Sequence, residues 1–202
     1  MSKPWTSPTS KPTAASDQPN RFTDSDVENL HDLHGDPEVM RFVNGGRAVS
    51  REVIREETLP RFLRAYERFE GLGVFAAIER STGEFVGWFE FCPREEEAAP
   101  EEVELGYRLR RSAWGKGYAT EGSRALIRKG FAELGVRRVV ADTLAVHAAS
   151  RRVMEKAGLV YVRTFHQEWP YRIEGDEHGD VEYALTKADW ERQASVRFTP
   201  NN

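Results

Sequence analysis

The chain has 202 residues, of which 39% are hydrophobic and 31% charged, and its formal net charge is −4. This length allows one domain with a sizeable core, and interspersed charges of both signs argue against bulk nucleic-acid binding. No apolar run approaches the roughly 20 residues of a membrane span, and no signal-peptide pattern is visible. Because Cys92 is the single cysteine, we expect a cytoplasmic protein without an intramolecular disulfide. We also expect a monomer or a homodimer.

Composition divides the chain into three parts. Residues 1–20 are rich in Pro, Ser and Thr and poor in aliphatic side chains. Such a segment buries too little apolar surface to offset the entropy of ordering, so we expect a disordered tail. One globular domain is expected over residues 21–195, followed by a flexible C-terminus over 196–202.

Helical and strand patterns then follow one another along the domain. Two helical patterns come first, over 22–43, with a cap at Thr23 or Ser25, and over 51–69, where Pro60 should separate two helices or kink one. The expected strands are 74–78, 85–92, 103–109, 136–144, 160–165 and 181–185, the first two joined as a hairpin. Later helices are expected over 119–134, over 150–157 with Gly158 as its left-handed cap, and from 186–189 onward. This order predicts a mixed α/β fold.

The stretch AWGKGYATEGSRALI, residues 113–127, places two glycines directly before an amphipathic helix. The first N–H groups of a helix lack partners and carry the positive end of the helix dipole, so they bind phosphate when the backbone can approach closely. Glycines permit that approach, and Lys116 adds positive charge. Neither the P-loop pattern nor the GxGxxG pattern is present. On these residues alone, phosphate binding and a tight turn without a ligand remain equally open.

Three stretches together, ELGYRL from residue 104, WGKGYATEG from 114 and SRRVMEKAGL from 150, resemble the GNAT superfamily of acetyltransferases. Within this superfamily the chain is similar to the ribosomal-protein N-terminal acetyltransferase branch (RimJ/RimL-like). Three further stretches also resemble this branch: FTDSD, DPEVMRFV and YALTKADW. The resemblance therefore spans about residues 21–190. It implies a mixed, mostly antiparallel central sheet flanked by helices. The family also has an apolar strand before FTDSD, where this chain reads AASDQPNR, so we expect that strand to be short or missing.

The resemblance implies an N-acetyltransferase that moves the acetyl group of acetyl-CoA directly to a primary amine, without a metal. The acceptor would be a protein or peptide N-terminus or a small-molecule amine. The alternative is a non-catalytic acyl-CoA-binding or regulatory module with the same fold. Four departures from the family pattern keep that alternative open: Trp114, His147, Met154 and Leu159.

The resemblance also assigns the cofactor contacts. The strand backbone at Tyr107 and Leu109 should pair with the pantetheine amides, and the Leu109 N–H is the candidate donor to the oxyanion. The family's loop Q/R-x-x-G-x-G/A maps onto Trp114-Gly115-Lys116-Gly117-Tyr118-Ala119, and Thr120 follows. His147 stands where the family has an Asn that contacts the cofactor.

Two residues carry the expected proton chemistry. An aliphatic ammonium must lose a proton before it can attack, and family precedent places a carboxylate, often acting through water, on the strand occupied by Glu104. Glu102 points to the same face, but there we favour a surface charge. Ser150 matches a serine of the branch that could serve near the sulfur. Met154 stands at the position of a tyrosine acid in some members, so that role is vacant.

The remaining candidates favour structural or acceptor-side roles. His31 and His34 lack a third ligand, so a partly exposed helix face is expected there instead of a metal site. Cys92 should be a small buried residue and not an acyl carrier. The basic cluster Arg108, Arg110 and Arg111 should border the cofactor phosphates or solvent. The loop 166–180, with aromatic and acidic residues, should line the acceptor side, although it could equally be solvated.

Overall fold

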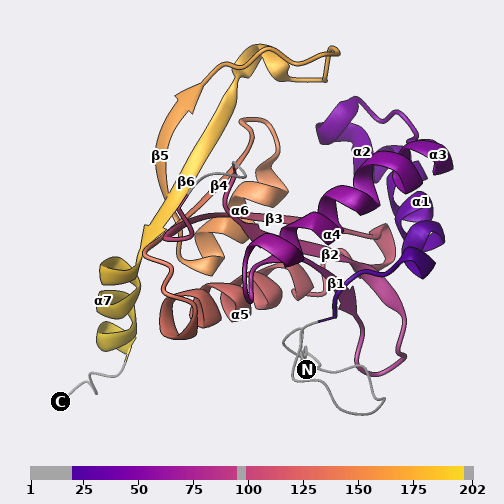
Figure 1. The fold of residues 1–202 in the computed structure, drawn as a ribbon. Coiled ribbons are helices and arrows are strands. Elements are labelled where there is room, and N and C mark those ends of the chain that lie inside the picture. Colours follow the sequence, from indigo (N-terminus) through magenta and orange to yellow (C-terminus); the bar gives the residue numbers. More distant parts are fainter. Residues whose placement is uncertain (1–19, 95–98, 198–202) are drawn as a thin grey trace.

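Six strands form one sheet in the computed structural model, which describes residues 20–94 and 99–197 (Figure 1). The strands are β1 (Gly73–Ile78), β2 (Phe85–Cys92), β3 (Glu102–Leu109), β4 (Arg138–Leu144), β5 (Val160–Phe165) and β6 (Asp180–Thr186). Their order across the sheet is β1-β2-β3-β4-β6-β5, and only the β3–β4 pair is parallel. The predicted mixed, mostly antiparallel sheet is confirmed.

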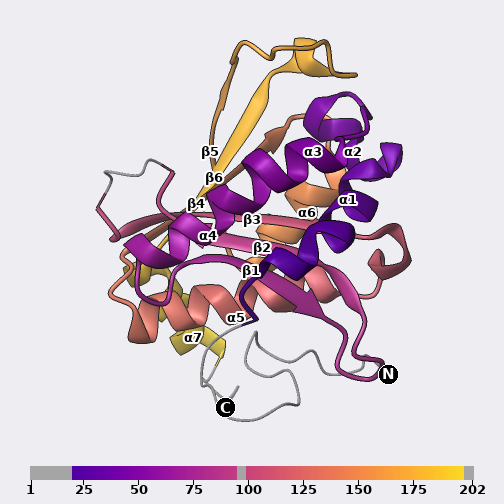
Figure 2. The same cartoon turned by 45° about the vertical axis from the view of Figure 1, so that its right-hand side comes forward.

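Helices cover both faces of this sheet (Figures 1 and 2). The helices are α1 (Val27–Gly35), α2 (Pro37–Asn44), α3 (Arg51–Val53), α4 (Leu59–Arg68), α5 (Tyr118–Glu133), α6 (Ala148–Ala157) and α7 (Lys187–Arg197). Apolar residues of α1 and α4 pack with β1 and β2 in one core, whereas those of α5 and α6 pack against the sheet in the other. The two cores are separated by the sheet because strand side chains alternate between its faces.

The N-terminal region agrees with one expectation and differs from another. Before FTDSD, where we expected the apolar strand of the family to be short or missing, the described residues form one isolated bridge between Arg21 and Phe75. Pro60 lies in the first turn of α4, directly after a π-helical segment, Ile54–Thr58. Because a proline without an N–H is tolerated in a first turn, the helical run continues from Arg51 to Arg68. The tail predicted over residues 1–20 lies almost entirely outside the described residues.

Helix α5 lies unusually close to strand β2. A Cβ atom on Gly122 would lie 2.3 Å from the Phe89 ring, and one on Gly130 would lie 2.6 Å from the Phe91 ring. Only glycine fits under these two rings, so the sequence accepts the helical cost of glycine at both positions. The close packing fixes the N-terminal end of α5 next to the end of β3.

Candidate active site

The central feature of the site is a splay between β3 and β4. The two strands pair only where Glu102–Glu104 face Arg138–Val140, although β3 continues to Leu109 and β4 to Leu144. On its other edge β3 stays paired with β2, and the Arg110 N–H donates to Val86 O at 2.8 Å. Since alternate residues of a strand direct their N–H groups to opposite edges, the Leu109 N–H points toward the splay. An extended chain of amides could pair there.

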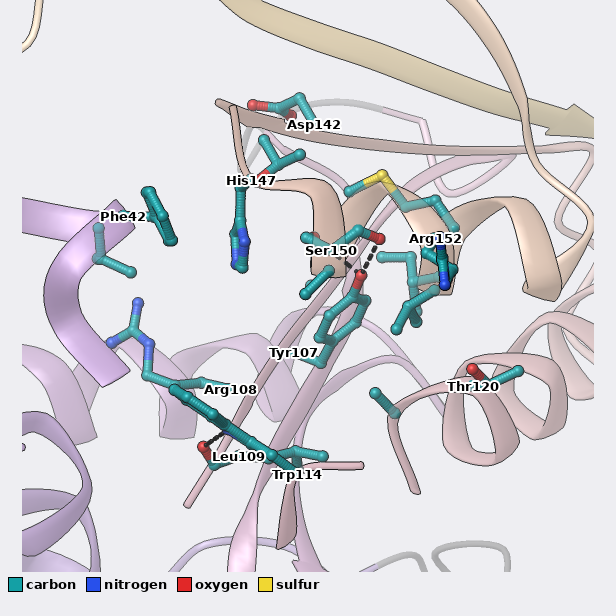
Figure 3. A pocket seen from close by; sticks show the side chains of 18 of the residues that line it. Phe42, Tyr107, Arg108, Leu109, Trp114, Thr120, Asp142, His147, Ser150 and Arg152 are labelled. Carbon is teal, nitrogen blue, oxygen red and sulfur yellow. Dashed lines mark hydrogen bonds between the residues drawn. The ribbon is translucent and has the colours of Figure 1, made fainter. Parts of the chain in front are cut away.

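A cavity of about 640 Å³ opens at this splay (Figure 3). It is lined by residues from α2, β2, β3, the glycine turn, β4, α6 and β6. The predicted site residues that line it are Glu104, Tyr107, Leu109, Trp114, Gly115, Gly117, Ala119, Thr120, His147 and Ser150. Lys116 and Tyr118 are the two predicted residues that are not among the lining residues. The cavity therefore brings the strand, turn and helix motifs together.

The glycine turn has the geometry expected of an anion site. Gly115 has φ of 71° and Gly117 has φ of 88°, a left-handed conformation that favours glycine. A Cβ atom on either residue would meet no atom within 4 Å, so the space above the backbone is open. Gly117 caps the 16-residue helix α5 without a side-chain hydrogen bond to the first turn. The first N–H groups of α5 are thus available to a pyrophosphate.

Trp114 closes the end of β3. Its indole N–H donates to Leu109 O at 2.8 Å, and the side chain is 49% exposed at the cavity rim. The hydrogen bond takes up the carbonyl of Leu109 and leaves the N–H of that residue directed to the splay. Trp114 therefore shapes the strand end in place of the Gln or Arg of the family pattern.

Glu104 is a half-buried carboxylate in this cavity. Burial raises the pKa of Glu104 to about 7, although the nearby Arg94 guanidinium acts in the opposite direction and Asp142 and Glu90 add to the rise. Arg94 Nε lies 3.2 Å from Glu104 Oε2, and Arg94 also pairs with Asp142. The carboxylate is thus poised between its two protonation states at neutral pH, as a general base requires.

Glu102 has a different environment, although it lies on the same face of β3. Its side chain is exposed, and its Oε2 lies 2.5 Å from Arg138 NH1. Exposed ion pairs of this kind contribute little to stability, and Glu102 is not among the residues that line the cavity. These contacts favour the surface reading of Glu102.

Tyr107 and Ser150 form a hydroxyl pair on the opposite face of β3 from Glu104. The Tyr107 hydroxyl donates to Ser150 O at 3.0 Å and lies 2.9 Å from Ser150 Oγ. Burial raises the pKa of Tyr107 to about 12, although the hydrogen bond to Ser150 lowers it. Tyr107 is therefore neutral at physiological pH and remains a hydrogen-bond donor. Figure 3 shows the pair in the middle of the cavity, between Thr120 and His147.

Comparisons with known proteins agree with this geometry. The family model of the acetyltransferase (GNAT) domain matches residues 20–160. FsC-acetyl coenzyme A-N(2)-transacetylase of Aspergillus fumigatus is 34% identical over 173 residues, which cover 83% of this chain and 72% of that protein. The chain belongs to the GNAT acetyltransferase family. As a member it is an acetyl-CoA-dependent N-acetyltransferase, and the non-catalytic alternative falls away.

Solved structures support the GNAT fold. An aminoglycoside acetyltransferase, AAC(6')-Ib, in complex with coenzyme A aligns with a TM-score of 0.67 at 21% identity, covering 87% of this chain and 97% of that one. RimL, a ribosomal L7/L12 alpha-N-protein acetyltransferase, in complex with coenzyme A aligns with a TM-score of 0.67 at 20% identity, covering 83% and 92%. At these identities the likeness concerns the fold alone.

Two predicted residues of the GNAT loop turn their side chains elsewhere. The Tyr118 side chain is buried and its hydroxyl bonds to Glu79, next to the β1–β2 turn. Lys116 Nζ lies 6.0 Å from the Tyr118 ring. Their side chains lie outside the cavity lining, so a role for Lys116 and Tyr118 in cofactor binding would rest on the backbone.

His147 stands at the end of the cavity that faces α2. Its ring stacks on Phe42 with centroids 4.3 Å apart and an interplanar angle of 24°. Burial lowers the pKa of His147 to about 4, so the ring is neutral at physiological pH. Figure 3 shows both rings on the far side of Tyr107 from Thr120. The predicted cofactor contact of His147 stays a prediction, because its ring is engaged by α2.

Two expectations about side chains near the end of the cavity that faces α2 were wrong. His34 is buried, not partly exposed, because α1 packs on the sheet with this ring against Trp88. Burial lowers the pKa of His34 to about 3, and Arg108 acts in the same direction. Arg108 does not border the glycine turn: its NH1 lies 3.0 Å from His34 Nε2, and its guanidinium lies 4.9 Å from the Trp88 ring.

Arg110 and Arg111, the other members of the basic cluster, pair at the surface with Asp32 at 3.6 Å and Asp36 at 3.9 Å, respectively.

Cys92 is buried, as predicted, and burial raises the pKa of its thiol. Among the described residues, no group of three potential metal ligands occurs, and no helix is long and apolar enough to cross a membrane.

The loop 166–180, predicted to line the acceptor side, reaches the cavity next to α2. Trp169 and Asp180 line it, and Tyr171 stacks with Arg47 at 3.9 Å while Glu174 bonds to Arg41 on α2. The loop is thereby tied to the α2 region, and its place on the acceptor side stays a prediction. Sequence reasoning missed Phe42, Trp88, Asp142 and Arg152, which also line the cavity. It named Arg108 in the basic cluster but did not connect it with Glu104, which lies on the same strand face.

Proposed function

We propose that this enzyme transfers the acetyl group of acetyl-CoA directly to a primary amine, on a small molecule or a peptide N-terminus, in the cytoplasm. The observation that carries the proposal is the Glu104 carboxylate, with its pKa of about 7, in the same cavity as the open glycine turn. The name of the Aspergillus relative, FsC-acetyl coenzyme A-N(2)-transacetylase, supports transfer of an acetyl group to a nitrogen atom. The motifs ELGYRL and SRRVMEKAGL support assignment to the RimJ/RimL-like branch.

Acetyl-CoA supplies an activated acyl group, so the protein must orient it and move protons. The N–H groups over Gly115–Thr120 would hold the pyrophosphate at the start of α5. The free β3 edge at Tyr107–Leu109 would pair with the pantetheine amides. The glycine turn and the β3 edge both fit acetyl-CoA. The space above the turn is open, and the edge at residues 107–109 is not paired with β4.

Three groups of the chain then serve the transfer. Glu104 accepts the proton of the amine, directly or through water. Its pKa of about 7 lies close to physiological pH, which suits a group that takes up and releases a proton. The Leu109 N–H, directed to the splay, donates to the developing negative charge on the acyl oxygen. The hydroxyl pair of Tyr107 and Ser150 can return a proton to the leaving sulfur. Glu104 and the hydroxyl pair lie on opposite faces of β3, so proton uptake and return are separated.

The proposal is tested by a thiol-release screen on the purified chain. The panel contains peptides with free N-termini, amino acids, polyamines and aminoglycosides, and CoA binding is measured in parallel by calorimetry. We expect CoA to bind and at least one class of amine to raise thiol release above the rate without amine. Binding of CoA without stimulation by any amine would contradict the proposed function.

A further inference from the structure

The cavity contains a cation that forms no ion pair with the residues that the structure describes. Arg108 lines the cavity next to Trp88, and in the described part of the chain it forms no ion pair with a carboxylate. Its single described hydrogen bond joins NH1 to His34 Nε2 at 3.0 Å. A guanidinium has five N–H donors in a planar fork, and only one nitrogen of Arg108 has a described hydrogen bond.

The neighbours of Arg108 orient it without neutralising it. His34 Nε2 also accepts a hydrogen bond from Trp88 Nε1 at 3.2 Å, so the imidazole acts as a neutral acceptor. Glu90 carries a negative charge that acts on Arg108. However, Glu90 Oε1 lies 3.9 Å from Arg61 NH1 and accepts a hydrogen bond from Cys92 Sγ at 3.6 Å. A charge removed from water requires a partner. The Trp88 ring, the His34 imidazole and strand β3 hold the Arg108 guanidinium in place. A ligand with a negative charge could then supply its ionic partner.

Arg108 shares a face of β3 with Glu104. Four residues along a strand correspond to about 13 Å between Cα atoms, and alternate side chains point to the same side. Gly106 lies between them and has no side chain, and a Cβ atom there would lie 3.3 Å from the Glu90 side chain. The Glu90 side chain, which also lines the cavity, therefore borders the floor between the Glu104 carboxylate and the Arg108 guanidinium. Figure 3 shows Arg108 extending toward α2 and Phe42, away from Thr120.

We propose that Arg108 binds a carboxylate of the acceptor, so that the preferred substrate is an amine carrying a carboxylate several bonds from the reacting nitrogen. This inference rests on the proposed function, because it places the amine at Glu104. A planar fork with open donors matches a carboxylate with two parallel hydrogen bonds. The separation along β3 excludes the short spacing of a simple α-amino acid as the best fit. Purely cationic polyamines and aminoglycosides would leave Arg108 unpaired and are disfavoured.

Matched acceptors test the inference on the wild-type enzyme. The pairs are 6-aminohexanoate with hexylamine, and glycylglycine with glycylglycine amide, compared by kcat/KM at the same concentration of neutral amine. We expect each carboxylate to exceed its partner by about 10- to 100-fold, as for a hydrogen bond to a charged group. The preference should collapse in Arg108→Gln and persist in Arg111→Gln, a control whose side chain is exposed at the surface. Equal kcat/KM within the pairs, or a preference that survives in Arg108→Gln, would overturn the inference.

Binding provides a second readout that does not depend on turnover. The CoA-loaded protein is titrated with 6-acetamidohexanoate or N-hexylacetamide while the tryptophan fluorescence is followed, since Trp88 lies against Arg108. The carboxylate compound should bind about 10-fold more tightly or better, and only in proteins that keep the guanidinium. CoA affinity of Arg108→Gln shows whether that variant is folded. If no amine is acetylated, the proposed function fails, whereas equal binding of the two compounds refutes the role of Arg108.

Discussion

Replacing Glu104 by Gln is the sharpest perturbation of the proposed chemistry. Glutamine keeps the size of the side chain and part of its hydrogen bonding, but it lacks a basic oxygen. If the carboxylate takes the amine proton, turnover should fall by about two orders of magnitude, the lower end for lost general-base catalysis. CoA affinity should barely change, because Glu104 lies on the other face of β3 from Tyr107 and away from the glycine turn.

The pH dependence gives the expected magnitude. Burial raises the pKa of Glu104 to about 7, so about half of these carboxylates are ionised at pH 7 and about a tenth at pH 6. The base must be ionised to act, and therefore kcat/KM of the wild type should fall about five-fold from pH 7 to pH 6 and approach about ten-fold for each further unit. In Glu104→Gln this inflection should disappear. The deficit of the variant should shrink at high pH, where more of the amine is already neutral.

The assay is thiol release on the best amine found, measured from pH 5.5 to about 9.5 for the wild type and two variants. Glu102→Gln is the matched control, because Glu102 lies on the same strand face but pairs with Arg138 at the surface. We expect the profile of the control to follow that of the wild type. If the profiles of the wild type and Glu104→Gln coincide, Glu104 is a structural charge and the proton leaves by another route.

Three further changes test the rest of the site. Gly117→Val should abolish CoA affinity, since a β-branched residue is strained at φ of 88° and its side chain would enter the open space at the turn; unchanged calorimetry in a folded variant would count against the pyrophosphate site. Cys92→Ala should keep most of the activity because the thiol is buried and its pKa is raised, and an acetylated Cys92 peptide that forms and decays during turnover would disprove direct transfer. Ser150→Ala and Tyr107→Phe should each lower kcat by about ten-fold, and the double variant should lose little more, because the two hydroxyls share one hydrogen bond. Additive losses would show that they act separately.

Local patterns predicted most of the fold. The strand runs, the glycine turn and the Gly158 cap depend on residues close in sequence, and the structure places all of them where periodicity and turn chemistry indicate. The position of Glu104 relative to the turn follows from strand alternation. The splay of β3 from β4 could not be predicted, because it depends on where the parallel pairing stops.

The end of the cavity that faces α2 shows the same limit. Arg108 was expected at the phosphates or in solvent, as one member of a short basic cluster with Arg110 and Arg111. Its actual partners, His34 and Trp88, reach it through the packing of α1 on β2, and His34 lies 74 residues away in the chain. Likewise the stacking of Phe42 on His147 joins α2 to the start of α6. No local pattern indicates such contacts, so the residues at this end of the cavity became visible only in the folded chain.

The most direct test of direct acetyl transfer is the stoichiometry of a single reaction. Free thiol and the mass of the acceptor are measured together over time, with the mass of the intact protein as a third record. Direct transfer predicts one acetyl group on the acceptor nitrogen for each thiol released, and no acetylated protein at any time. Thiol released without an acetylated acceptor, or an acetyl group that passes through the protein, would contradict it.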